Sequence, residues 1–159
     1  MAHAAFEQDI FVSVPPEMVS NFLAAMQNHP QIHPLIVAIT PLDPTTGQDG
    51  RLVQRYHIRD RMRLGPFTLA FTYLATLQTD APGELHFEAF QFPRIRLSNT
   101  TRCLPEGTGT RVSEQVQIEA PRLLMRTVFQ QARQSHHHML LNLKRHLEAA
   151  QATASAPPG

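Results

Sequence analysis

The prolines of this chain divide it into short segments, followed by one long proline-free segment, residues 122–156. Proline fixes the backbone φ angle and lacks an amide proton, so it is excluded from helix interiors and central strands. The segments between prolines therefore predict separate secondary-structure elements. Their order is one strand, short helices, six strands and one long helix. That order predicts an α+β fold in which a curved antiparallel sheet packs against the last helix.

Apolar and polar residues alternate in several of these segments, which is the pattern of strands with one buried face, and Leu35 to Thr40 is a short β-rich run. The pattern is clearest where Phe71, Tyr73 and Ala75 share one face and threonines occupy the other. Short turns rich in glycine and proline link most of the segments, so successive strands are expected to pair antiparallel. The predicted strands comprise residues 6–14, 35–40, 51–64, 67–77, 85–92, 94–104 and 110–118.

Two regions show helical spacing. Pro15-Pro16 ends the first strand, and apolar residues then recur at helical spacing until a stop near His29-Pro30. Pro121 opens a helix of about seven turns that ends near Ala150. Its apolar stripe comprises Met125, Val128, Phe129, Ala132, Met139, Leu140, Leu143 and Leu147. We expect residues 1–150 to form a single domain and residues 151–159 to be a disordered tail.

The composition excludes several classes of protein. A formal net charge of +1 argues against a general attraction to nucleic acid or anionic membranes. The longest apolar runs fall far short of the roughly 20 residues that span a bilayer, so we expect no integral membrane segment. We predict no secretory signal, because the first seven residues lack a basic stretch followed by an apolar one. The single Cys103 cannot form an internal disulfide, so we expect a cytoplasmic protein.

Three local sequences resemble the START-like, Bet v 1-like superfamily, also called SRPBCC or the polyketide cyclase/dehydrase and lipid-transport group. Ile10 to Pro16 (IFVSVPP), followed by a short helix, resembles the opening of that family. Gly107 to Val112 (GTGTRV) resembles the turn into its last strand, and His138 to Lys144 (HMLLNLK) resembles the end of its last helix. The resemblance covers roughly residues 5 to 149, and it rests on the order of the three motifs together.

The resemblance implies a helix-grip fold. In this fold a curved seven-stranded antiparallel sheet surrounds the long C-terminal helix, with two short helices after the first strand. It also implies a cavity between the sheet and the helix. Members of the family bind lipids, sterols, quinones, polyketides or plant metabolites, and a few catalyse cyclisation or dehydration. The fold alone does not choose among these functions.

Counting along the strands and the last helix places several polar side chains on apolar faces. They are Gln54, Asp60, Asn99, Glu114 and His136. A buried polar group must be paired or it costs a few kcal/mol, so each is either a structural pair or a functional group.

Glu114 and His136 are the most informative of these residues. Glu114 is either a cavity carboxylate, with a pKa raised by burial, or the structural partner of an inward arginine or histidine; a bulge could also turn it to solvent. His136 is either an acid or base for a ligand or a satisfied core residue. Asp60 lies between Arg59 and Arg61, which favours a surface ion pair. Tyr56 and Tyr73 are cavity hydroxyls or packing residues.

The remaining patterns predict no metal and no cofactor. His136, His137 and His138 are consecutive on a helix, so their side chains diverge and cannot converge on one ion. No glycine-rich phosphate loop or nucleophile elbow is present. A row of arginines on one strand favours a solvated face, with the steering of an anionic ligand as the alternative; it comprises Arg51, Arg55, Arg59, Arg61 and Arg63.

The leading hypothesis is binding or transport of a small hydrophobic ligand, such as a lipid, a quinone or a polyketide-like molecule. The predicted lining is Tyr56, Phe71, Tyr73, Phe87, Asn99, Glu114, Phe129, His136 and Met139. The segment from His29 to Pro34 is expected to form a lid. The first alternative is a cyclase, aromatase or dehydratase that uses Glu114 and His136. The second is a co-chaperone-like interaction module, which predicts a filled core and an exposed apolar patch.

Overall fold

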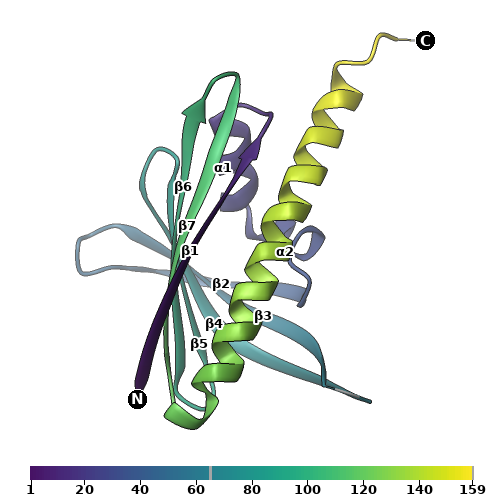
Figure 1. Cartoon of the computed structure of the whole chain (residues 1–159). Coiled ribbons are helices and arrows are strands. Elements are labelled where there is room, and N and C mark those ends of the chain that lie inside the picture. Colours follow the sequence, from purple (N-terminus) through teal and green to yellow (C-terminus); the bar gives the residue numbers. More distant parts are fainter. Residues whose placement is uncertain (65, 159) are drawn as a thin grey trace.

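The computed structural model describes residues 1–64 and 66–158, apart from the side chains at 63 and 64, and it confirms the predicted order of elements (Figure 1). The first strand, β1 (Ala2–Val12), leads into helix α1 (Pro16–Ala24) and the 3-10 helix η1 (Met26–Gln31). Six strands and a long helix follow: β2 (Ile36–Thr46), β3 (Leu52–Leu64), β4 (Phe67–Ala81), β5 (Glu84–Gln91), β6 (Ile95–Glu106), β7 (Gly109–Ala120) and α2 (Arg122–Ala154). This is the α+β helix-grip architecture.

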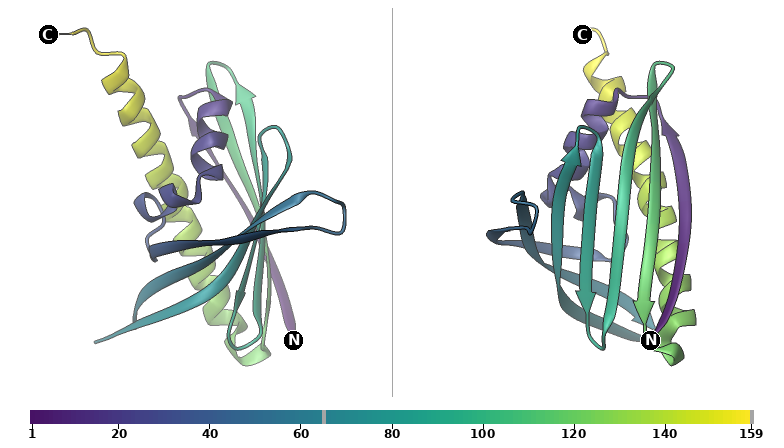
Figure 2. Two further views of the ribbon diagram at one scale, coloured as in Figure 1. Left: turned by 180° about the vertical axis from the view of Figure 1, so that it is seen from behind. Right: turned by 90° about the vertical axis from the view of Figure 1, so that its left-hand side faces the viewer.

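The strands form one antiparallel sheet in the order β1-β7-β6-β5-β4-β3-β2. Strands β2 to β7 make a meander, and β1 pairs with β7, so β1 and β2 are the two edges. The sheet curves around α2, and α1 and η1 lie between the helix and one end of the sheet (Figure 2). The register places Gln8 beside Glu114 and places Thr101 beside Glu114 from the other side.

The second predicted strand continues past the proline that was predicted to end it. The sequence predicts that the strand of residues 35–40 ends before Pro41, but β2 continues through Pro41 to Thr46. The physical reason is that β2 is an edge strand paired only with β3, so the missing amide proton of Pro41 can face away from the sheet. Two register shifts in the pairing of β2 with β3 accommodate the irregularity.

The helix boundaries also shift. The helical region after β1 ends at Gln31, one residue beyond the predicted stop near His29-Pro30, and η1 includes this proline. The C-terminal helix α2 extends to Ala154, four residues beyond the predicted end at Ala150, so residues 151–154 of the expected tail are helical. The first strand begins at Ala2 rather than Phe6 and ends at Val12, although Val14 is still fully buried.

The core lies between the concave face of the sheet and α2. The C-terminal half of α2 anchors the helix, since Leu140, Leu143 and Leu147 are at most 5% exposed. In its N-terminal half, Met125, Val128 and Phe129 are only half-buried. The amide of Asn142 on α2 donates to the carbonyl oxygen of Ile32 at 2.8 Å, which ties the segment after η1 to the helix. In the described part of the chain no helix combines the length and apolarity needed to cross a bilayer.

Candidate functional site

A cavity of about 530 Å³ lies between the concave face of the sheet and α2. Strands β3 to β7 supply one wall, the N-terminal half of α2 supplies the other, and η1 with the segment after it closes one end. Most of the lining is apolar side chain, which suits a ligand bound mainly through its carbon skeleton. The N-terminal half of α2 packs on one side of the sheet through Ala132, which contacts the cluster of Phe6, Val116 and Ile118 and also lines the cavity.

Seven of the nine residues predicted as lining border this cavity: Phe71, Tyr73, Phe87, Asn99, Glu114, His136 and Met139. Two do not border it. Tyr56 is 7% exposed and packs in the core beyond the cavity. Phe129 packs edge-to-face on Phe6 at 5.8 Å between ring centroids, on the side of α2 that faces β1.

Glu114 is the centre of a buried polar cluster in the cavity wall. Its side chain is 1% exposed, and three donors from three elements are directed at it. Gln8 Nε2 donates to Oε2 at 2.9 Å, and Asn99 Nδ2 donates to Oε1 at 3.1 Å. His136 Nδ1 lies 3.2 Å from Oε2. Thr101 Oγ1 in turn donates to Asn99 Oδ1 at 3.4 Å, so the cluster is a connected network.

This network makes Glu114 the partner of an inward histidine, which is one of the alternatives that the sequence left open. Burial alone raises the pKa of the carboxyl group, as the sequence suggested. The charge of His136, together with hydrogen bonds from His136, Gln8 and Asn99, outweighs burial, so the pKa lies below its usual value. Glu114 is therefore a paired carboxylate and a weak base, and its contact with Nδ1 fixes the orientation of the His136 ring.

Asp60 lines the same cavity, and the prediction that it forms a surface ion pair is wrong. The residue is 4% exposed, and its partner is the Tyr73 hydroxyl, which lies 3.3 Å from Oδ1 and 3.4 Å from Oδ2. Burial raises the pKa of Asp60 to about 6, although the hydrogen bond from Tyr73 opposes the rise. Arg59 and Arg61 point to the opposite, exposed face of β3 because strand side chains alternate.

The arginine row lies on this outer face of β3. Arg51, Arg59 and Arg61 are exposed and Arg55 is half-buried, in agreement with a solvated face. The side chain of Arg63 lies outside the described residues.

Two histidines that the sequence analysis did not assign to the cavity also line it. The ring of His29 is buried, and its Nε2 lies 2.8 Å from the carbonyl oxygen of Leu23. His33 accepts a hydrogen bond at Nδ1 from the Leu35 amide at 3.2 Å, and its ring meets that of His136 edge-to-face at 6.0 Å. Burial lowers the pKa of both, that of His33 to about 3 with help from the charges of His136 and His29.

The low pKa of His33 predicts a specific loss of stability in acid. Between the unfolded pKa of about 6.5 and the folded value of about 3, the unfolded chain binds a proton that the folded one does not. Stability therefore falls as the pH falls through this window. We expect His33→Asn, which keeps an acceptor for the Leu35 amide, to reduce the slope of unfolding free energy against pH by about 1.4 kcal/mol per pH unit.

Urea unfolding at several pH values between about 4 and 6 measures this slope. His138→Asn, at an exposed position on α2, is the matched control. An unchanged slope in the His33 variant would contradict the buried neutral imidazole.

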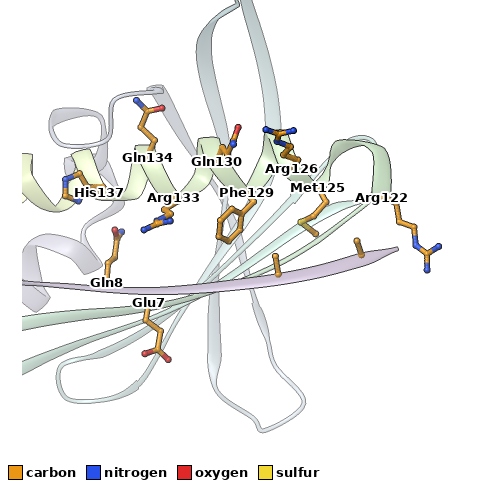
Figure 3. Close-up of a pocket in the computed structure, with 12 residues that line it drawn as sticks. Glu7, Gln8, Arg122, Met125, Arg126, Phe129, Gln130, Arg133, Gln134 and His137 are labelled. Atoms are coloured by element: carbon orange, nitrogen blue, oxygen red, sulfur yellow. The ribbon is translucent and has the colours of Figure 1, made fainter.

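A second, more open groove runs between β1 and the N-terminal half of α2 (Figure 3). Its volume is about 1020 Å³, and Phe129 and Met125 point from the helix toward β1. Arg122, Arg126, Arg133 and His137 give the groove a basic wall, with Glu7 as its single acidic residue. Gln8 also lines the groove, so its hydrogen bond to Glu114 joins the groove to the wall of the cavity.

The other candidate groups do not form a reactive site. In the described ranges no three histidine, cysteine, aspartate or glutamate side chains are arranged to hold a metal ion. Burial raises the pKa of the Cys103 thiol to about 11, which makes it a poor nucleophile.

Comparison with known proteins gives the fold. No protein-family model and no curated protein matches the chain. Among solved structures, the Zhui aromatase/cyclase from Streptomyces sp. R1128 matches with a TM-score of 0.77 and 14% identity, over 98% of this chain and 100% of its own. A START superfamily protein from Mycobacterium smegmatis gives a TM-score of 0.69 and 15% identity, over 94% and 99% of the two chains. Ara h 8.0201 gives 0.67 and 15%, over 93% and 99%.

The chain therefore has the fold of the START-like, Bet v 1-like proteins, which confirms the fold that the sequence resemblance implied. At identities of 14–15% this likeness defines the fold, and the function has to be argued from the residues of this chain.

Proposed function

We propose that this protein binds a small, largely apolar molecule in the cavity between the sheet and α2, and carries or presents it. The observation that supports this proposal is the cavity itself, about 530 Å³ in volume, with an apolar lining and a polar cluster in one wall. Cavities of a few hundred Å³ suit small organic ligands. Affinity would come from burying ligand carbon, at about 0.8 kcal/mol per methylene group.

Polar groups at two places in the cavity would fix the orientation of the ligand. One is the cluster of Glu114, Asn99 and His136, and the other is the pair of Asp60 and Tyr73. Both can exchange hydrogen bonds with a hydroxyl or carbonyl group on an otherwise apolar skeleton. The segment from His29 to Pro34 covers one end, and we retain it as the proposed lid. A cytoplasmic location remains part of the proposal.

A cavity-filling variant tests binding. Ala89 lines the cavity from β5, and Ala89→Phe places a ring in the space that the ligand would occupy. We expect affinity for the hydrophobic fluorophore N-phenyl-1-naphthylamine to fall by about tenfold or more. Ala70→Phe, at an exposed position on β4, is the matched control and should bind as the wild type does. Equal affinity in the two variants would place the fluorophore outside the cavity and contradict the proposal.

The second candidate function is acid–base catalysis, and the Glu114–His136 contact is the observation that favours it. Both residues line the same cavity, as catalysis on one ligand requires. Because Glu114 holds Nδ1, the ring nitrogen left to exchange a proton with a ligand is Nε2, which has no hydrogen bond among the described residues. In this alternative His136 would be the acid or base, and Glu114 would position it.

The interaction-module alternative predicts a filled core as well as an exposed apolar patch, and the cavity of about 530 Å³ counts against the filled core.

A further inference from the structure

Five large apolar side chains are exposed at the end of the molecule away from α1. They come from three segments: the start of β4, the turn between β5 and β6, and the first turn of α2. All three segments lie at the lower end of Figure 1. We call this set the apolar rim: Phe67, Leu69, Phe92, Leu123 and Leu124.

Three residues of the apolar rim border a mouth of the cavity, and Phe67 and Leu123 lie close to two of them in the chain. Leu69, Phe92 and Leu124 are exposed to solvent and also line the cavity, so the interior opens between them. Phe92 is 95% exposed and Leu123 is 96% exposed, so neither contributes its side chain to the core. Several large apolar side chains exposed at one end of the molecule, three of them at the opening of the cavity, mark a docking surface rather than chance exposure.

Positive charge accompanies the apolar rim. Arg94 lies in the β5–β6 turn, and Arg122 and Arg126 belong to the first turns of α2, beside the groove of Figure 3. All three are exposed, and none of them forms an ion pair within the described part of the chain. The acids nearby are already engaged: Glu88 pairs with Arg96, and Glu119 lies 3.4 Å from His3. Because the whole chain carries a net charge of only +1, this attraction for anions is local.

We propose that the apolar rim docks on the surface of an anionic phospholipid bilayer, so that the cavity mouth opens against the membrane. Separate projecting apolar side chains flanked by arginines fit a fluid apolar layer beneath anionic headgroups. This inference rests on the proposed function, because a mouth at the membrane matters only if the cavity takes a ligand. An apolar ligand would then pass between bilayer and cavity without crossing bulk water.

Vesicle co-sedimentation tests the docking. The probes are vesicles of equal parts phosphatidylcholine and phosphatidylglycerol, compared with pure phosphatidylcholine. The variant is Phe67→Ser with Leu123→Ser, because neither residue lines the cavity. The matched control is Leu52→Ser with Leu104→Ser, which removes two remote apolar side chains of 57% and 52% exposure.

We expect the rim double variant to partition onto anionic vesicles about tenfold less than the wild type, and the control to stay within about twofold. Arg122→Gln with Arg126→Gln should also reduce binding to anionic vesicles about tenfold. The proposal is overturned if the wild type does not bind anionic vesicles. It is also overturned if the rim double variant and the Leu52/Leu104 control lose binding equally. A dimer that dissociates in the rim variant, without any vesicle binding, would assign this surface to self-association instead.

Fluorophore binding without vesicles separates this inference from the proposed function. The rim double variant should bind N-phenyl-1-naphthylamine as the wild type does. If the wild type binds the fluorophore but not the vesicles, only the docking fails. If the wild type does not bind the fluorophore, the proposed function fails.

Discussion

Replacing Glu114 by glutamine is expected to lower the free energy of unfolding at neutral pH by about 2–3 kcal/mol. The carboxylate accepts from Gln8 and Asn99 and contacts His136, and it is 1% exposed. An amide of the same shape has one acceptor oxygen instead of two. At least one buried donor therefore loses its partner, and His136 loses a negative neighbour. Chemical denaturation of both proteins at neutral pH measures the difference.

The effect of Glu114→Gln on stability should depend on pH in a defined direction. The folded pKa of Glu114 is lowered, so the carboxylate contributes stability above its unfolded pKa, and this contribution is lost as the pH falls through the folded pKa. The difference between wild type and Glu114→Gln should therefore shrink in acid. Glu119→Gln, the same change at a half-exposed site on the same strand, should stay within about 0.5 kcal/mol. If Glu114→Gln is as stable as Glu119→Gln, the hydrogen bonds to the Glu114 carboxylate do not stabilise the fold, which contradicts the prediction.

Replacing Asp60 by asparagine is expected to stabilise the protein at pH 7 and above by about 2 kcal/mol. Burial raises the pKa of Asp60 to about 6, so holding it ionised at neutral pH costs folding free energy. Asparagine has no charge and still offers an oxygen to the Tyr73 hydroxyl. Because ionisation gives the carboxyl group its charge, the free-energy cost of burying that charge is full above the folded pKa. This cost disappears below the unfolded pKa of 3.8, where the group is protonated in both states.

Thermal or urea unfolding at neutral pH and near pH 4 measures this effect. The gain from Asp60→Asn should be full at the higher pH and close to zero at the lower one. Asp43→Asn, at an exposed position on β2, is the matched control and should change stability by less than about 0.5 kcal/mol. A destabilised Asp60 variant at neutral pH would mean that the carboxylate is held by favourable contacts. A gain in stability would fit a carboxylate kept for its interaction with a ligand.

The strand faces could be predicted because strand side chains alternate with a period of two. That period placed Asn99 and Glu114 on the concave face, and both line the cavity. The alternation does not say how far along a strand the cavity reaches. The predicted lining therefore includes Tyr56, although this residue packs in the core beyond the cavity. Asp60 was misjudged from its sequence neighbours Arg59 and Arg61, although the same alternation turns them to the other face.

The helical contributions were harder to predict for geometric reasons. The apolar stripe of α2 is wide enough to contact both β1 and the cavity, and the sequence does not say which part does which. Phe129 therefore faces Phe6 on β1, whereas Met139 lines the cavity. His29 lies in η1 and His33 just after it, in a short segment with no apolar periodicity. The prediction for this segment was a lid, and nothing in its sequence shows that the two histidine rings face the cavity.

The central claim is that the cavity between the sheet and α2 holds a small, largely apolar molecule. Native mass spectrometry of gently purified protein, followed by extraction of whatever is released on denaturation, tests it most directly. We predict a one-to-one adduct of an apolar molecule that the wild type and Ala70→Phe retain and that Ala89→Phe loses. A mass equal to that of the bare chain, unchanged after incubation with N-phenyl-1-naphthylamine, would contradict the claim.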